Sequence, residues 1–330
     1  MALFAAIALA ACSDPQSTGV DAAVDAAASA CKPTSPRSVP VSVFVTPDDG
    51  EKPYIDTINA ASKNLRVFAY LMGEGGILDG LKKRAGQGVD VRVILDVRNS
   101  SNQKYRDELV GAGVKVLWSD TQFTHMHAKV IIADDVEAIV STGNYSYYYA
   151  INRNRDYLAR VADPQDLEDL IAIFEADWKL ANPDLSCTRL LVSPVNSKQR
   201  LLELVNSAQS SLDIASMQLA ETDTRAAVIA RAKGGVKVRA LLADPSWVDA
   251  NQAAAAALKG ASIPVRYLKT PGMHAKLLLV DSKWAYLGSI NLSYTSMTKN
   301  REVGLLTSAT AALQRLSATF NQDWSQATPF

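Results

Sequence analysis

The chain has 330 residues, of which 48% are hydrophobic and 21% charged, and this composition predicts a globular protein with one large core or two medium ones. Lys plus Arg and Asp plus Glu each number 34, so the formal net charge is zero. A global field that attracts polyanions is therefore excluded, and nucleic-acid binding would need a local basic patch.

The N-terminal segment has the pattern of an export signal. Its first eleven residues, MALFAAIALAA, are apolar and too short to span a bilayer, but they suit the apolar region of a signal peptide. The stretch LAAC resembles a bacterial lipobox, in which the cysteine, here Cys12, is lipidated. We expect a signal peptide over 1–12 and an Ala/Asp/Ser-rich tether over 13–40. This predicts an exported lipoprotein of the bacterial cell envelope, on the outer membrane or periplasmic face, or a secreted protein. The lipid anchor would make the membrane surface a partner. The alternative is a cytosolic protein with an apolar N-terminus.

The remaining cysteines are Cys31 and Cys187, an even number in an oxidising compartment. Each precedes a predicted first strand, at 41–45 and at 190–192. We expect a disulfide between them, and the alternative is two buried thiols.

The sequence repeats itself at a constant spacing. The tetrapeptide MHAK occurs at 126–129 and again at 273–276, a shift of 147, and the same shift relates GVDVRVIL to GVKVRALL and Asn144 to Asn291. A constant offset over this distance indicates duplication. We expect two homologous halves, 41–180 and 188–330, joined by a linker at 181–187 and related by a pseudo-two-fold axis.

Each half alternates short β-branched runs with amphipathic segments, which predicts an α/β fold: a mixed, largely parallel sheet flanked by helices. In the first half, the expected strands are VSVFV, LRVFAY, VDVRVIL, VKVLW and KVIIA, and the expected helices cover 54–62, 77–87, 103–112 and 164–180. In the second half, the last helix is expected over 311–322.

The repeated motif places one imidazole and one ammonium on a common surface. Residues two apart in a strand share a face, so His127 lies with Lys129, and His274 with Lys276. Asp134 and Asp281 follow the lysines at an odd step, in stretches typical of turns. We assign these two aspartates a structural role as caps of the backbone.

A second strand then leads to STGN in the first half and GSIN in the second, which present Thr142 and Asn144, and Ser289 and Asn291. Hydroxyl and amide groups suit the oxygens of an anion. If the halves face each other, the cleft contains two histidines, two lysines and two asparagines, a set that suits a phosphodiester.

These residue types indicate nucleophilic and acid–base chemistry. One neutral imidazole can attack phosphorus while the other, protonated, gives its proton to the leaving oxygen. The lysines and asparagines would stabilise charge on the non-bridging oxygens. Each histidine needs an acidic partner, and NRD and NRE supply Asp156 and Glu302 at matched positions.

The pattern His-x-Lys-x(4)-Asp-x(6)-Gly-Ser-x-Asn resembles the signature of the phospholipase D superfamily. The second half matches it fully, at His274, Lys276, Asp281, Gly288, Ser289 and Asn291. The first half matches at His127, Lys129, Asp134 and Asn144, with Ser141 and Thr142 where the family prefers Gly and Ser. The resemblance extends over essentially everything from residue 41 onward.

The resemblance implies a metal-independent phosphodiesterase without a cofactor, in which His127 forms a phosphohistidine and His274 serves as general acid and later as base. It also implies that Glu302 orients His127 and Asp156 orients His274 across the pseudo-two-fold axis. No His/Cys cluster has zinc-binding spacing, and no carboxylates are spaced for two metals. We expect a monomer, and we interpret His125 as a flanking histidine without a catalytic role.

Two substrate classes remain open. The first hypothesis is phospholipase D hydrolysis, or transphosphatidylation, of glycerophospholipids; the alternative is an endonuclease that cleaves DNA or RNA, and a third is a phosphate-binding protein without turnover. A basic rim of Arg153, Arg155, Lys299 and Arg301 would serve either substrate, with Arg155 and Arg301 in direct contact. The run NYSYYY at 144–149 could stack bases, surround choline, enter a lipid interface or pack within its loop.

Overall fold

The computed structural model of the protein describes residues 31–330. The expected signal peptide, Cys12 and most of the expected tether lie outside these residues. Within the described part of the chain, every helix is too short or too polar to cross a bilayer.

The two halves share one order of elements, except that the second half has two additional short strands and has an α-helix where the first has a π-helix. The first half consists of β1 (Ser42–Thr46), α2 (Lys52–Ala60), β2 (Asn64–Ala69), α3 (Gly76–Gly86), β3 (Asp90–Leu95), α4 (Asn102–Gly111), β4 (Lys115–Trp118), β5 (Val130–Ala133), β6 (Glu137–Ser141), the short π-helix η1 (Tyr147–Ile151), β7 (Asn154–Val161) and α5 (Pro164–Trp178). The second consists of β8 (Leu191–Ser193), α6 (Ser197–Asn206), β9 (Ser211–Ser216), α7 (Thr222–Lys233), β10 (Lys237–Leu242), α8 (Ala250–Gly260), β11 (Val265–Tyr267), β12 (Gly272–Met273), β13 (Lys276–Val280), β14 (Trp284–Gly288), α9 (Tyr294–Thr298), β15 (Glu302–Thr307), α10 (Thr310–Gln326) and β16 (Thr328–Pro329).

Each half has one mixed sheet flanked by helices, as the sequence predicts. The first sheet has the order β1-β7-β6-β5-β2-β3-β4, and the second has the order β16-β11-β10-β9-β13-β14-β15-β8. The expectation that the sheets are largely parallel is wrong. Within each half only β2-β3-β4 and β9-β10-β11 pair in parallel, and one further parallel pair, β12 with β7, crosses the junction. The short turn at 134–136 joins β5 to β6 as an antiparallel hairpin. The next strand of the sheet, β7, is also antiparallel to β6.

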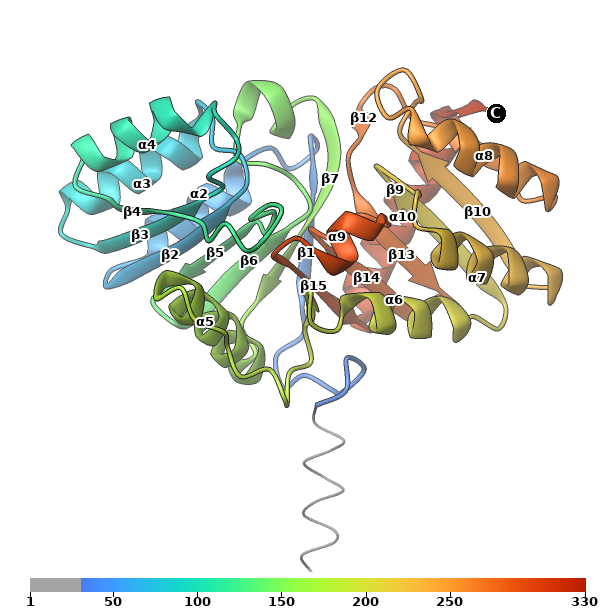
Figure 1. The fold of residues 1–330 in the computed structure, drawn as a ribbon, viewed down its shortest axis with the longest axis horizontal. Helices are drawn as coiled ribbons and strands as arrows, with labels where there is room; N and C mark the ends of the chain where they lie inside the picture. The colour runs from blue at the N-terminus through green and yellow to red at the C-terminus, as the bar shows by residue number, and fades with distance from the viewer. Residues whose placement is uncertain (1–30) are drawn as a thin grey trace, which may run out of the picture.

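The two sheets share one central core. A single cluster of buried side chains contains Phe68 and Val130 from the first half together with Leu277 and Leu287 from the second. Phe174 of α5 and Phe320 of α10 belong to the same cluster, and separate clusters fill the outer face of each sheet. In Figure 1 the halves accordingly lie side by side, with β7 and β12 meeting at the junction. The position of one half relative to the other is therefore fixed by apolar packing.

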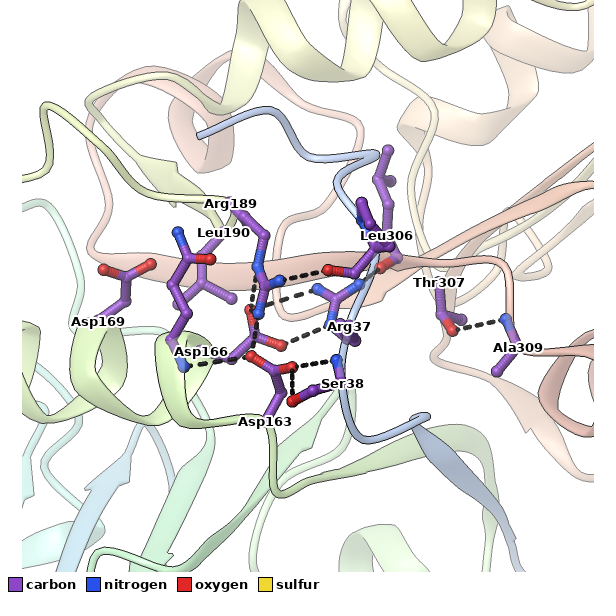
Figure 2. A network of polar contacts seen from close by, with 12 residues as sticks. Arg37, Ser38, Asp163, Asp166, Asp169, Arg189, Leu190, Leu306, Thr307 and Ala309 are labelled. Carbon is purple, nitrogen blue, oxygen red and sulfur yellow. Dashed lines mark hydrogen bonds and ion pairs between the residues drawn. The ribbon is translucent and has the colours of Figure 1, made fainter. Parts of the chain in front are cut away.

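The segment before β1 joins both halves instead of forming part of a tether. Figure 2 shows Arg37 between Asp166 of α5 and the carbonyl oxygen of Leu306 in β15, which accepts a hydrogen bond of 2.6 Å. Arg189 contacts Asp166 at 3.0 Å and also pairs with Asp163. The four ion-paired side chains are each at most 6% exposed. A disulfide joins Cys31 to Cys187 of the linker, the pair expected from the cysteine count.

Candidate active site

Backbone pairing across the junction positions both motif histidines. The N–H groups of His127 and Ala128 donate to the carbonyl oxygen of Arg301, at 2.9 and 3.0 Å, just before β15. In the second copy, β12 pairs in parallel with the start of β7, and His274 N–H donates to the carbonyl oxygen of Arg155 at 3.2 Å. The chain before each histidine is therefore in register with the strand of the other half that contains an acid.

This register places each imidazole against a carboxylate of the opposite half. His127 Nδ1 lies 2.7 Å from Oε2 of Glu302, and His274 Nδ1 lies 2.9 and 3.0 Å from the two oxygens of Asp156. A carboxylate can only accept, so each Nδ1 has the proton and each Nε2 keeps its lone pair. The crossed arrangement is the one that the resemblance implies.

The acids are themselves held by hydrogen bonds. The hydroxyl of Ser296 and the amide of Asn300 both donate to Oε1 of Glu302, the latter at 2.9 Å. The Thr142 hydroxyl donates to Oδ1 of Asp156 at 2.5 Å. The sequence does not predict the roles of Ser296 and Asn300, although Asn300 lies in the NRE stretch that contains Glu302.

The expectation that Thr142 and Ser289 bind substrate is wrong. Both side chains are fully buried. The Thr142 hydroxyl contacts Asp156 and accepts from the Tyr157 N–H at 2.9 Å, and the Ser289 hydroxyl accepts from the Val303 N–H at 3.1 Å. The hydroxyls hold the tight loop against the next strand, and their hydrogen bonds are made within the protein.

The loop is tight because glycine permits close contact. A Cβ atom on Gly143 would lie 2.7 Å from Oδ2 of Asp156, and one on Gly288 would lie 2.3 Å from the Cα of Gly304. Neither contact leaves room for a side chain. These glycines allow each loop to approach the strand that contains the acid.

The two motif lysines lie inside the junction. Lys276 Nζ donates to the carbonyl oxygens of His274, at 2.6 Å, and of Thr142 in the other half, at 3.1 Å. Lys129 donates to the carbonyl oxygen of His127, and its ammonium lies 5.0 Å from the centre of the Tyr70 ring. Burial lowers the pKa of Lys276 to about 8, and it lowers the pKa of Lys129 well below the ordinary lysine value.

The histidines and acids respond to the same environment. Burial lowers the pKa of His127 to about 3, against the opposing effect of Glu302, and Lys129 lowers it further. Burial likewise lowers the pKa of His274. Burial alone would raise the pKa of Asp156 and Glu302, but their histidine partners and the lysines outweigh it, so both carboxyl groups titrate below their usual range. The site therefore combines ionised acids with imidazoles that favour the neutral form.

The two motif asparagines occupy equivalent positions at the junction. Asn144 and Asn291 are half-buried, and the side-chain Oδ1 of each is buried without a hydrogen-bond partner in residues 31–330. Buried polar atoms normally have a partner, so the hydrogen bonding of both amides is incomplete within the described residues.

Asp134 and Asp281 cap turns, as the sequence predicts. Each has a positive φ, 52° and 53° respectively. The carboxylate of Asp134 accepts the N–H groups of 62–64, and that of Asp281 accepts those of 209–211. Both aspartates thus fasten the loop that leads into the central strand, β2 or β9.

The expectation that Arg155 and Arg301 form part of a basic rim is wrong. Both are 2% exposed, and each pairs with an acid on the last helix of the other half: Arg155 Nε with Asp323 at 2.7 Å, and Arg301 Nη2 with Asp177 at 2.9 Å. The guanidinium groups join the halves beneath the site. Arg153 and Lys299 are exposed, so they alone remain of the predicted rim.

His125 lies beside the site without joining the crossed pairs. Its Nδ1 is 3.4 Å from Oδ2 of the buried Asp96, and its ring meets that of Tyr70 edge to face at 5.4 Å. Tyr70 also contacts the His127 ring, at 4.6 Å. In the second half, a ring from a different position stacks on the motif histidine: Trp247 lies over His274 with 6.1 Å between the ring centroids.

The described part of the chain contains no group of three or more His, Cys, Asp or Glu side chains that could hold a metal ion. The repeated motifs and their acids bring two imidazoles, two ammonium groups, two amides and two carboxylates to the junction.

A family model matches both halves of the chain, and known proteins are similar to it in sequence. The family model described as "Cardiolipin synthase, PLD-like domain" matches residues 54–178 and 201–324. The probable cardiolipin synthase YwiE of Bacillus subtilis (strain 168) is 22% identical over 329 residues, which cover 84% of this chain and 65% of that protein. The mitochondrial cardiolipin hydrolase of Homo sapiens is 30% identical over 131 residues, which cover 39% of this chain and 52% of that protein.

Among solved structures, the phosphatidylserine synthase of Haemophilus influenzae Rd KW20 has a TM-score of 0.67 at 15% identity, covering 88% of this chain and 87% of that one. At this identity the likeness shows the fold alone. The chain spans slightly less than two thirds of the length of the full-length bacterial relatives it matches. Because the two family matches fall one in each half and together cover most of the chain, the protein belongs to the phospholipase D superfamily.

Proposed function

We propose that the chain transfers the phosphatidyl group of a glycerophospholipid to an alcohol or to water, without a metal ion, through a phosphohistidine on His127. The observation that supports this most is the crossed arrangement, in which His127 pairs with Glu302 and His274 with Asp156. Two oriented imidazoles with free Nε2 atoms, beside two buried ammonium groups, suit in-line displacement at a phosphodiester.

In the first step, His127 Nε2 attacks phosphorus, the bond to the headgroup oxygen breaks, and His274 gives its Nε2 proton to that oxygen. In the second step, neutral His274 takes the proton of the incoming alcohol or water, whose oxygen attacks phosphorus and displaces His127. The lowered pKa of His127 keeps this nucleophile unprotonated at neutral pH. A bound phosphodiester anion would raise the pKa of His274, which favours the acid form needed in the first step.

The lipid substrate is supported by the relatives, whose names include cardiolipin synthases and a cardiolipin hydrolase. Some of these relatives are named synthases and one is named a hydrolase, so experiment must determine whether an alcohol or water accepts the phosphatidyl group. The structure favours nucleic acid less than the sequence does, because Arg155 and Arg301 are buried in ion pairs and cannot contact a polyanion.

We also propose that the protein acts outside the cytosol, attached through Cys12. The disulfide between Cys31 and Cys187 supports an oxidising compartment. Metabolic labelling with a radioactive fatty acid in a bacterial host should mark the wild-type chain and not Cys12→Ala. Labelling of both chains, or of neither, would contradict lipidation at Cys12.

The test of the function uses the full chain, vesicles of phosphatidylglycerol and phosphatidylcholine, and single-stranded DNA, all in EDTA. Release of headgroup, or a transfer product when glycerol is added, is expected from wild type and not from His127→Ala. The ratio of transfer to hydrolysis then identifies the acceptor. DNA cleavage with intact lipid would move the protein to a nuclease function, and activity that EDTA abolishes and a metal restores would exclude the metal-free mechanism.

A further inference from the structure

The exposed aromatic side chains of the described chain gather in three segments. They are Tyr147, Tyr148, Tyr149, Trp247 and Tyr294, and we name them the aromatic rim. Within residues 31–330, every other Phe, Tyr and Trp is buried or half-buried. Isolated exposed rings are ordinary, but a gathering of all of them marks an interaction surface.

Each segment of the rim is fixed to the site. The helix η1 lies between Asn144 and the strand that contains Asp156, and α9 lies between Asn291 and the strand that contains Glu302. Tyr147 and Tyr294 are the first residues of these two helices and differ in number by 147. Figure 1 shows α9, and the short green coil that leads into β7, near the junction of the halves. The rim therefore borders the site from both halves.

Trp247 supplies the third segment, between β10 and α8. Its ring lies 6.1 Å from the His274 ring at an interplanar angle of 21°. It is nevertheless 46% exposed, so one part of the ring contacts the site and the other part faces solvent. Tyr148 and Tyr149 are more exposed still, at 54% and 75%.

Exposed positive charges accompany the rings at equivalent positions. Arg153 follows η1 and Lys299 follows α9, and neither forms an ion pair with a carboxylate of residues 31–330. The Lys299 ammonium lies 5.6 Å from the centre of the Tyr294 ring. Tyrosine and tryptophan rings with basic side chains between them are the composition that proteins place at the boundary of lipid headgroups and acyl chains.

We propose that the aromatic rim is a membrane-docking surface, which places the site against an anionic phospholipid bilayer with Arg153 and Lys299 among the lipid phosphates. This rests on the proposed function, since a lipid-cleaving site must meet its substrate at the bilayer surface. Three consecutive tyrosines in one helical turn point in different directions, which suits a fluid headgroup layer better than a row of stacked bases.

The first experiment measures insertion directly. Tyr149→Trp and Val136→Trp place an added indole in the rim and on the exposed β5–β6 turn, respectively, in the full chain. With phosphatidylglycerol vesicles that contain lipid brominated near the headgroup end of the acyl chain, we expect additional quenching for Tyr149→Trp and none for Val136→Trp, relative to the parent. Equal quenching of the two variants, or none in either, overturns the proposal.

The second experiment separates docking from catalysis. Tyr148→Ser/Tyr149→Ser is compared with the control Val136→Ser/Leu180→Ser on vesicles and on a short-chain phospholipid below its micelle concentration. We expect the rim variant to lose roughly tenfold on vesicles, because two inserted rings are removed, and to keep its activity on the monomeric lipid. The control should keep both activities. Equal loss on both substrates would make the tyrosines part of the substrate site, and selective loss of DNA binding would assign them to nucleic acid; either outcome overturns docking.

Failure of the proposed function can be distinguished from failure of membrane docking. If the Tyr149→Trp indole is quenched but no phospholipid is turned over by the wild type, docking stands and the lipid-cleaving function does not.

Discussion

Replacement of Glu302 by glutamine tests how the nucleophile is prepared. Oε1 of Glu302 accepts from Ser296 and Asn300, so the glutamine oxygen must take that place and its NH2 group must face His127 Nδ1. A donor there forces Nδ1 to accept and moves the imidazole proton to Nε2. The lone pair that should attack phosphorus is then lost, although the volume and packing of the side chain are preserved.

The expected loss follows from the geometry. The carboxylate is fully buried and lies 2.7 Å from Nδ1, so water cannot restore the tautomer. An equivalent change in a catalytic triad lowers kcat by roughly 10⁴-fold, and we expect about 10³- to 10⁴-fold here, or about 4 to 5 kcal/mol of barrier.

The assay is steady-state turnover of phosphatidylglycerol vesicles, together with rapid-quench detection of the phosphoenzyme. Glu168→Gln is the matched control, because Glu168 is exposed on α5. Glu302→Gln should form phosphoenzyme slowly while its melting temperature stays close to that of wild type. Turnover within tenfold of wild type, by a folded variant, would show that Glu302 does not set the tautomer.

Three further results are expected. His274→Ala should still form the phosphoenzyme from a substrate with a good leaving group and then retain it, so mass spectrometry should find the phosphoryl group on His127; phosphate on another residue would overturn the role assignment. Lys276 is charged below its pKa of about 8 and neutral above it; affinity for a singly charged, non-hydrolysable phosphonate ester should therefore fall as pH rises through about 8, and calorimetry showing constant affinity from pH 7 to 10 would contradict this. Arg155→Ala leaves the fully buried Asp323 without its partner, which should lower the free energy of unfolding in urea by about 3 to 5 kcal/mol. The double variant Arg155→Met/Asp323→Leu should recover most of this stability. A single variant as stable as wild type would show that the ion pair does not join the halves.

The sequence predicts the fold and the main site residues because each motif occurs twice, and the two copies can be compared position by position. The offset of 147 aligned both copies of the motif, and an offset of 146 located Asp156 and Glu302. The crossed pairing of these acids came from the family resemblance, since spacing along the chain does not show which half supplies a partner. Helix positions were correct to within a few residues because amphipathic periodicity is a local property.

Side-chain direction and long-range partners were beyond the sequence. Thr142 and Arg155 lie next to catalytic positions, and proximity alone suggested contact with substrate. The structure turns both inward, and the partner of Arg155, Asp323, is 168 residues away. The antiparallel share of the sheets was also missed, because the direction of a strand depends on its tertiary neighbours.

The crossed pairs have a consequence for how this protein can change over evolutionary time. Neither half contains a complete His–acid pair, because each histidine is paired with a carboxylate of the opposite half. A gene fragment that encoded one half would be inactive unless its product met a second copy or the missing half. A shift of one residue in the register at β7 or β15 would disable both reaction steps at once. Substitutions on the outer surfaces of the two copies can therefore accumulate independently. Substitutions at the junction of the halves must remain compatible with the opposite copy.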